Sequence, residues 1–207
     1  MLLTTIYIIA IIAEAMSGAI MAMRRGMDLF GICLIGTITA LGGGTIRDML
    51  LNHYPIGWVK HPEYLLYTTV AAIATTFTVR YLHHLRYIFL LVDGLGLVAF
   101  TIIGCNIGLA GGVHFSIAII AGMVTGVFGG LLRDLLCNQM PLVLQKEIYA
   151  MVSLAAGAAY VAMLKVGIGA GTASVAALAG GVLFRMLAIH YRWKLPSFKN
   201  ADIRGFD

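Results

Sequence analysis

The chain has 207 residues, of which 60% are hydrophobic and only 11% are charged. Soluble domains carry about 25% charged residues, so this composition excludes an ordinary soluble protein and predicts an integral membrane protein. The formal net charge is +5, but the basic residues lie in short connections and in the tail. There they indicate membrane topology, and we expect no nucleic-acid partner.

Seven apolar segments are long enough to cross a bilayer, which takes about 20 residues. They are predicted over residues 2–23, 29–51, 63–80, 88–110, 115–138, 147–164 and 171–191. The predicted fold class is therefore an all-α membrane protein with seven transmembrane helices. The helices form a single transmembrane domain, residues 1–192, and a polar tail follows at residues 193–207.

The connections between the segments carry very different charge on the two sides of the membrane. One side has nine basic residues and the other has two. The nine are Arg24, Arg25, Arg80, Arg86, Lys146, Arg192, Lys194, Lys199 and Arg204, and the two are Lys60 and Lys165. Because basic residues gather on the cytoplasmic side, we expect the N-terminus outside and the C-terminus and tail in the cytoplasm.

One stretch of the sequence occurs twice, with an offset of 86 residues. Of the 13 positions from residue 43 to residue 55, seven are identical in the second copy. The pairs are Gly43 with Gly129, Gly44 with Gly130, Arg47 with Arg133, Asp48 with Asp134, Leu50 with Leu136, Asn52 with Asn138 and Pro55 with Pro141. We infer a duplicated three-helix unit, about residues 1–80 and 87–164, with a seventh helix at about 171–191 outside it. Since three crossings reverse the direction of entry, the repeats are inverted, as in many proteins that pass solutes.

The glycines of this stretch lie inside the second and fifth segments. They are Gly42, Gly43, Gly44, Gly129 and Gly130. Each glycine costs a helix about 1 kcal/mol relative to alanine, so a run of them permits a bend or a local break. A broken helix exposes carbonyl groups, which a membrane protein tolerates only where they line water or are buried in protein. We expect these glycines to be kink positions that line a pore; the alternative is close helix packing through small residues.

Each glycine run is followed by an arginine and an aspartate, Arg47-Asp48 in the first copy and Arg133-Asp134 in the second. Charges inside a transmembrane segment cost a few kcal/mol and usually face a cavity or a partner. Neighbours on a helix point about 100° apart, so the members of each pair need not bond with each other. By inversion, the first pair lies toward the outer face and the second toward the inner face, as charged rings at the two mouths of a pore. The alternative is that the arginines reach the membrane interface and merely anchor their helices.

Two further acids, Glu14 and Asp93, lie in the first helix of each repeat. We expect them to be associated with the pore, where they neutralise the arginines across the repeat interface or attract cations. The alternative is a structural ion pair or a protonated buried acid. The sequence contains no nucleophile, metal-ligand or phosphate-loop pattern, so it predicts neither an enzyme nor a bound metal or cofactor.

These motifs resemble those of prokaryotic members of the trimeric intracellular cation channel (TRIC) family, over about residues 3–192. They are Gly42-Gly43-Gly44-Thr45-Ile46-Arg47-Asp48, Gly126-Val127-Phe128-Gly129-Gly130-Leu131-Leu132-Arg133-Asp134, Asp93-Gly94-Leu95-Gly96 and Pro141-Leu142-Val143-Leu144-Gln145-Lys146-Glu147. The resemblance implies a homotrimer in the prokaryotic plasma (inner) membrane, with one pore in each subunit. That pore is lined by the glycine-kinked second and fifth helices and conducts K⁺ or Na⁺. Animal members bind a phosphoinositide lipid at a basic site in the fifth helix, where this chain has only Arg133 after Gly130; the expected partners are monovalent cations and membrane lipid.

The leading hypothesis is a cation-selective channel in which carbonyl groups, Asp48 and Asp134 favour cations and the arginines tune or gate the pore. Bacterial relatives are also described as carrying a glycine-transporter-type domain, and inverted repeats suit a secondary transporter of a small solute such as glycine equally well. A third hypothesis is a structural or lipid-organising membrane protein. Ion flux measured beside amino-acid uptake in proteoliposomes separates the first two.

Overall fold

Seven long helices make up the computed structural model, which describes residues 2–79, 85–144, 148–191 and 193. They are α1 (Leu2–Arg24), α2 (Leu29–Leu50), α4 (Glu63–Thr78), α5 (Leu85–Ala110), α6 (Phe115–Leu136), α7 (Tyr149–Lys165) and α8 (Ala170–His190). Two short helices lie in the connections, α3 (Gly57–Lys60) and η2 (Leu142–Leu144). The predicted segment ends at residues 80 and 147, the basic residues Arg80, Lys146 and Arg192, and the tail from residue 194 fall outside the described residues.

All seven segments predicted from the sequence form helices. Five of them, α1, α2, α5, α6 and α8, are long and apolar enough to cross a membrane. The other two are shorter, since α4 has 16 residues and α7 has 17. At 1.5 Å per residue they extend about 24 and 26 Å, a few ångströms less than a hydrocarbon core of about 30 Å.

The second helix of each repeat begins at a side-chain cap. At the start of α2, the Asp28 carboxylate accepts the Gly31 N–H at 2.8 Å. At the start of α6, the His114 ring nitrogen Nδ1 accepts the Ser116 N–H at 3.4 Å. Such side chains satisfy an N–H that has no partner in the first helical turn. Asp28 and His114 are 86 residues apart (114 − 28), so the two repeats cap the same position with different residues.

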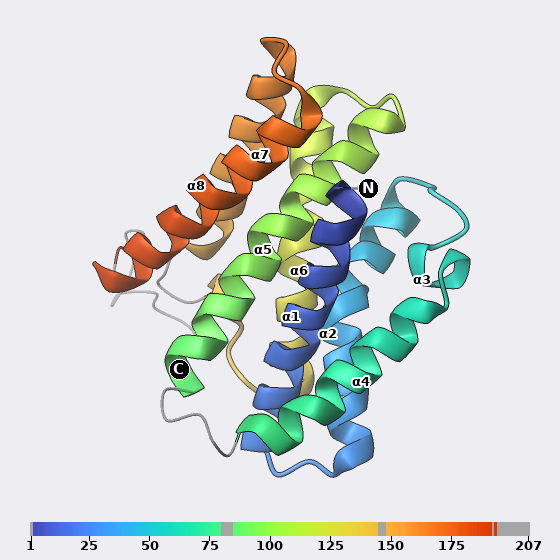
Figure 1. Cartoon of the computed structure of the whole chain (residues 1–207), viewed down its shortest axis with the longest axis vertical. Helices are drawn as coiled ribbons and strands as arrows, with labels where there is room; N and C mark the ends of the chain where they lie inside the picture. The colour runs from blue at the N-terminus through green and yellow to red at the C-terminus, as the bar shows by residue number, and fades with distance from the viewer. Residues whose placement is uncertain (1, 80–84, 145–147, 192, 194–207) are drawn as a thin grey trace, which may run out of the picture.

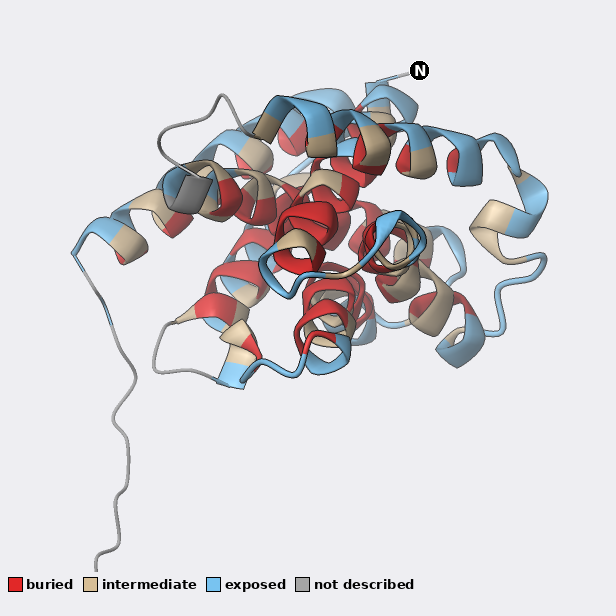
Figure 2. Ribbon diagram, turned by 90° about the horizontal axis from the view of Figure 1, so that it is seen from below, coloured by how far each residue is buried: buried red, intermediate tan, exposed pale blue. Residues whose placement is uncertain are grey.

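The helices pack as two similar groups of three (Figure 1). In the first repeat α1 contacts α2 and α4, and in the second repeat α5 contacts α6 and α7. The two groups meet where α2 contacts α6 and where α1 contacts α5, and α8 packs on α7 and α5. Seen end-on, the buried residues gather on the central helices and the exposed ones face outward (Figure 2). This exposed perimeter is largely apolar, as expected for a surface that faces lipid.

The packing within each repeat follows further identities at the same offset of 86 residues. They are Gly18 with Gly104, Gly36 with Gly122 and Thr39 with Thr125. A Cβ atom on Gly18 would lie 2.8 Å from the Gly36 Cα, and one on Gly104 would lie 2.8 Å from the Gly122 Cα. The crossing of α1 and α2 therefore has the same close geometry as the crossing of α5 and α6, because small residues let the backbones approach.

The helices α2 and α6 also end in the same way. Asn52 and Asn138, which the repeat pairs, have positive φ angles of 52° and 49°. In each case the N–H of the following residue bonds the carbonyl oxygen five positions earlier. The bonds join His53 to Asp48 and Gln139 to Asp134, both at 2.8 Å. This is the Schellman arrangement, which favours glycine and then asparagine at the left-handed position.

We expect the two positions with positive φ, Asn52 and Asn138, to tolerate substitution by glycine but not by alanine. Asn52→Ala should lower the free energy of unfolding by about 1 kcal/mol, because an L-residue with a Cβ atom is strained in this conformation. Asn52→Gly should leave the stability unchanged or raise it. Thermal unfolding of the purified protein in detergent checks both, and the Asn138 variants should give the same order. An alanine variant as stable as the glycine variant would contradict the prediction.

Candidate functional site

The helices α2 and α6 cross at two glycines that the repeat pairs. A Cβ atom on Gly43 would collide with the Thr125 carbonyl oxygen, and one on Gly129 would collide with the Thr39 carbonyl oxygen. Thr39 and Thr125 are also 86 residues apart (125 − 39), so the two contacts are reciprocal. The pseudo-two-fold axis of the repeats therefore passes between the two glycines, where one backbone lies directly against the other.

The glycines do not break either helix. The helix α2 is continuous from Leu29 to Leu50, and α6 is continuous from Phe115 to Leu136. The sequence permits a local break at these glycines, but neither helix is broken in this structure. At Gly43 and Gly129 the absence of a side chain serves close packing instead, while the role of the glycines as kink positions stays a prediction.

The neighbouring glycines have different surroundings. A Cβ atom on Gly42 would lie 2.7 Å from Cδ1 of Leu132 on the opposite helix. A Cβ atom on Gly44 would lie 3.6 Å from Nη2 of Arg47, and one on Gly130 would lie 3.5 Å from Nη2 of Arg133. Gly44 and Gly130 thus border the arginine of their own repeat, whereas the residue before each of them lies at the helix crossing.

Arg47 and Asp48, in the last turn of α2, bond with each other. Arg47 Nε and Nη2 donate to Asp48 Oδ1 at 3.0 and 2.7 Å. The sequence left open whether these neighbours pair, and they do, because the long arginine side chain bends back far enough to reach the adjacent carboxylate. The two side chains are only 4% and 1% exposed, so the pair is buried at the end of its helix.

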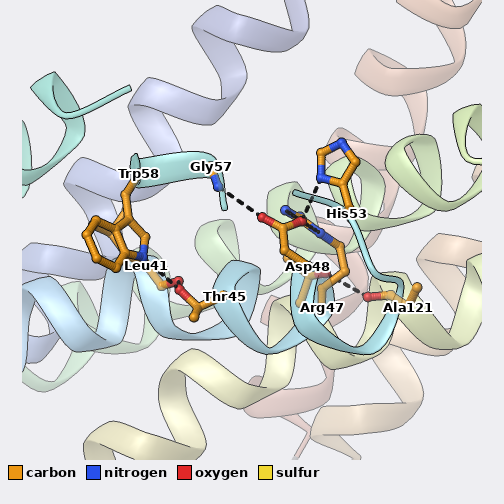
Figure 3. Close-up of polar contacts among 9 residues, drawn as sticks. Leu41, Thr45, Arg47, Asp48, His53, Gly57, Trp58 and Ala121 are labelled. Atoms are coloured by element: carbon orange, nitrogen blue, oxygen red, sulfur yellow. Dashed lines mark hydrogen bonds and ion pairs between the residues drawn. The ribbon is translucent and has the colours of Figure 1, made fainter. Parts of the chain in front are cut away.

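Asp48 also fixes the connection that follows α2 (Figure 3). Its Oδ1 lies 3.0 Å from His53 Nδ1, and its Oδ2 accepts the N–H of Gly57, the first residue of α3, at 3.1 Å. The Trp58 indole donates to Thr45 Oγ1 at 3.1 Å. The short helix α3 is thereby bonded to the last two turns of α2. A helix of four residues is too short to show a periodic pattern in the sequence.

Arg133 lies in a buried polar group formed by both repeats, which we call the α6 cluster: Glu14, Ser17, Asp93, Arg133 and Asp134. Arg133 Nη1 donates to Asp93 Oδ1 and to Ser17 Oγ, both at 2.6 Å. Arg133 Nε donates to Asp134 Oδ1 at 2.8 Å. The Arg133 side chain is completely buried, so it does not reach toward the membrane interface. Side chains from α1, α5 and α6 therefore all bind this one arginine.

Two acids complete the α6 cluster. Asp134 Oδ2 accepts the N–H of Leu142, the first residue of η2, at 2.9 Å, which matches the bond from Asp48 to α3. Glu14 is buried against Gly96, where any Cβ atom would collide with the Glu14 carboxylate. Gly96 lies one helical turn after Asp93, so the Glu14 and Asp93 carboxylates face the same part of α5. Among the described residues, Glu14 Oε2 has no hydrogen-bond partner.

Arg47 and Asp48 lie in the wall of a cavity of about 260 Å³, which we call the α2 cavity. Its polar lining residues are Thr4, Tyr7, Arg47, Asp48, His53, Lys60, His61, Tyr64 and Asn106. Tyr7 is the counterpart of Asp93 at the offset of 86 residues, and Ile103 is the counterpart of Ser17. Tyr7 and Ile103 both line the cavity. The same position in the two repeats is therefore an open cavity at one end and a closed ion pair at the other.

The sequence identified the charged residues of both places but missed the residues that surround them. Ser17 and Tyr7 are not acidic and belong to no motif, yet the offset of 86 residues relates Ser17 to Ile103 and Tyr7 to Asp93.

Arg185, on α8, has its guanidinium carbon 4.7 Å from the centre of the Tyr149 ring. Within the described ranges, no group of three or more His, Cys, Asp or Glu side chains is placed to hold a metal ion.

The family model described as glycine transporter matches the chain twice, over residues 4–80 and 90–165. The two matches begin 86 residues apart (90 − 4), which is the offset of the internal repeat. The inner membrane protein YadS of Escherichia coli K12, a UPF0126 protein, is 37% identical over 186 residues, with 89% of this chain and 90% of the relative covered. The UPF0126 membrane protein YvgT of Bacillus subtilis is 35% identical over 192 residues, 92% of this chain and 93% of the relative.

Solved structures of TRIC channels have the same fold. The orthologue of the trimeric intracellular cation channel from Rhodobacter sphaeroides superposes with a TM-score of 0.88 at 34% identity, covering 92% of this chain and 98% of that chain. A second TRIC cation channel gives a TM-score of 0.86 at 32% identity, with 95% and 97% covered. These matches confirm the all-α fold with seven transmembrane helices and inverted repeats. The chain therefore belongs to the UPF0126 family of membrane proteins, which the glycine transporter model describes, and it has the fold of the prokaryotic TRIC channels.

Proposed function

We propose that this protein is a K⁺- or Na⁺-conducting channel of the inner membrane, a homotrimer with one pathway in each subunit. The support is the likeness to TRIC cation channels at 34% and 32% identity over more than nine-tenths of the chain. The transmembrane domain comprises residues 1–192, with repeats at about 1–80 and 87–164, the seventh helix at about 171–191, and a cytoplasmic tail at 193–207.

The pathway follows the crossing of α2 and α6, between the α2 cavity and the α6 cluster. The observation that carries this proposal is the reciprocal contact of Gly43 and Gly129 with the opposite backbone. At these two glycines the contact is between backbones, so no side chain of either glycine has to be unpacked when the two helices separate. The carbonyl oxygens of Thr39 and Thr125 then face the gap. Each keeps its helical hydrogen bond through one lone pair and offers the second to a cation.

The charged residues at the two ends control entry to this pathway. Asp48 and Asp134 favour cations, and each is held in place by the arginine before it. In the present conformation the α6 end is closed, because Arg133 is bonded to Asp93 of its own repeat and to Ser17 across the repeat interface. Opening that end requires the Arg133–Asp93 ion pair to rearrange, and two carboxylate oxygens there, Glu14 Oε2 and Asp93 Oδ2, have no hydrogen-bond partner among the described residues.

The orientation that we propose places the N-terminus outside and the α2 cavity on the outer side. Support comes from the ends of the bundle, since the turn between α7 and α8 lies at the opposite end from the connection between α1 and α2 (Figure 1). Lys165 belongs to the first of these ends, and Arg24 and Arg25 belong to the second. The end that is richer in basic residues is cytoplasmic under the positive-inside rule.

A reversible cross-link between α2 and α6 tests the pathway. We expect wild-type protein in planar bilayers to pass K⁺ current whose reversal potential follows the K⁺ gradient. In the double variant Gly42→Cys with Leu132→Cys, oxidation should abolish this current and reduction should restore it. The two positions face each other across the crossing, with 2.7 Å between a Gly42 Cβ atom and Leu132 Cδ1, which brings two cysteines near bonding range.

The controls are the two single-cysteine variants and the wild type, which already has three cysteines of its own. All three should keep their current under the same oxidant. A cross-linked double variant that still conducts would place the pathway elsewhere than the α2–α6 crossing. A folded wild-type protein that passes no current would overturn the channel function itself.

The second candidate function is a transporter of a small solute such as glycine. The observation that favours it is the one-sided access, because the α2 cavity is open while the equivalent Arg133 is enclosed. Alternating access between two inverted repeats produces such a difference. Saturable uptake of labelled glycine into proteoliposomes, with no unitary currents, would support the transporter over the channel.

A further inference from the structure

The two arginines of the repeat have different partners at the same atom. Arg133 Nη1 bonds the Asp93 carboxylate and the Ser17 hydroxyl, each at 2.6 Å. Arg47 Nη1 is buried and has no hydrogen-bond partner among the described residues. The other nitrogens of Arg47 are engaged by Asp48. A buried guanidinium N–H group without an acceptor is unfavourable. The second repeat satisfies Nη1 and leaves Arg133 Nη2 without a partner among the described residues, whereas the first repeat leaves Nη1, the nitrogen that Asp93 binds in the second, unsatisfied.

The difference follows from two substitutions between the repeats. Tyr7 stands where the second repeat has Asp93, and Ile103 stands where it has Ser17. The first repeat thus lacks the carboxylate and the hydroxyl that bind the arginine in the second. In their place the α2 cavity, of about 260 Å³, has Tyr7, Ile103 and Arg47 in its wall.

The charges around this cavity favour an anion. Among its lining residues, Arg47 and Lys60 are cationic and Asp48 is anionic, which gives a net charge of +1 with neutral histidines (2 − 1). The Asp48 carboxylate is already used by Arg47, by His53 and by the Gly57 N–H. It therefore has little capacity to balance a second cationic group, and the remaining positive charge has no counterpart in the lining.

We propose that the α2 cavity binds a small carboxylate anion on Arg47, with Lys60 as the second cationic group. The bound carboxylate takes the place that the Asp93 side chain has on Arg133. The cavity lies below the range of about 300–1,000 Å³ that is usual for drug-sized ligands, so the anion is a small organic acid. This binding site does not depend on whether the protein conducts ions, and it is measured without any flux.

The test uses the purified full chain in detergent and follows its thermal unfolding in sodium acetate against sodium chloride at equal ionic strength and fixed pH. Since a ligand that binds only the folded state stabilises it, acetate should raise the unfolding midpoint saturably and chloride should not. Tyr7→Asp should abolish the response, because it supplies an internal carboxylate as Asp93 does in the second repeat. Tyr7→Asn is the matched control, with nearly the same side-chain size and no charge, and it should keep the response.

A third variant addresses the same site from the short helix α3. Lys60→Gln should weaken acetate binding by about fivefold or less, since Lys60 is exposed and exposed charge pairs contribute modestly. This variant keeps the test decisive if Tyr7→Asp does not fold. The proposal is overturned if acetate and chloride act alike on the wild type, or if Tyr7→Asp responds as Tyr7→Asn does. It is also overturned if inorganic phosphate binds the cavity and acetate does not.

Discussion

Asp93→Asn should destabilise the protein by about 3–5 kcal/mol, the usual cost of removing one partner from a buried ion pair. Arg133 would remain completely buried, and Asp134 would be the one carboxylate of the described residues still bonded to it. Asparagine keeps the size of the side chain, so the loss would come from the charge and not from a cavity. Equilibrium or thermal unfolding in detergent measures the effect.

The matched control is an exposed pair of the same chain. Glu63 lies 3.0 Å from His61 Nδ1, and both side chains are more than two-fifths exposed. Glu63→Gln should leave the unfolding midpoint close to that of the wild type, as is usual for exposed pairs. An Asp93→Asn variant as stable as Glu63→Gln would show that the α6 cluster does not depend on this ion pair.

A double-mutant cycle separates the pair from its surroundings. Arg133→Gln alone should also be strongly destabilising, because it leaves Asp93 and Asp134 in the α6 cluster without their bonded cation. The double variant with Asp93→Asn should lose less stability than the sum of the two single losses. Asp93→Asn removes the carboxylate that Arg133→Gln alone leaves unpaired, and Arg133→Gln removes the cation that Asp93→Asn alone leaves without this partner. Strict additivity would mean that the two residues are not coupled.

The seven helices and the inverted repeat were predictable because the bilayer imposes them. Apolar segments of transmembrane length leave few alternatives to helices. The duplication was visible at Arg47 and Arg133, since charged residues are rare within such segments. The same offset of 86 residues also relates Gly18 to Gly104, but no charged residue marks that pair.

The partners of the predicted residues were not predictable, because they depend on the bend of long side chains and on packing between distant helices. Arg47 reaches its own neighbour Asp48, against the expectation from Cβ directions. Arg133 is held by α1 and α5, which no local pattern reveals. The helix α3 is bonded to α2 where Asp48 accepts the Gly57 N–H, a contact nine residues along the chain (57 − 48).

Adjacent glycines on α2 should respond to alanine with opposite signs. Gly43→Ala should destabilise the protein by about 1–3 kcal/mol, because the new Cβ atom meets a backbone oxygen that only movement of the whole helix can displace. Gly44→Ala should stabilise it by up to about 1 kcal/mol through helix propensity. There the new atom has ordinary contact with the Arg47 side chain, at 3.6 Å. Thermal unfolding of the two variants in detergent measures the difference.

The second repeat provides an internal replicate, with Gly129→Ala in the role of Gly43→Ala and Gly130→Ala in the role of Gly44→Ala. Because both clashes lie on the pseudo-two-fold axis, the first alanine already pushes α2 away from α6. The double variant Gly43→Ala with Gly129→Ala should therefore lose less stability than the two single variants together. If Gly43→Ala instead stabilised the protein as Gly44→Ala does, the two backbones would not be in contact at the crossing. The proposed pathway would then lose the feature that lets α2 and α6 separate.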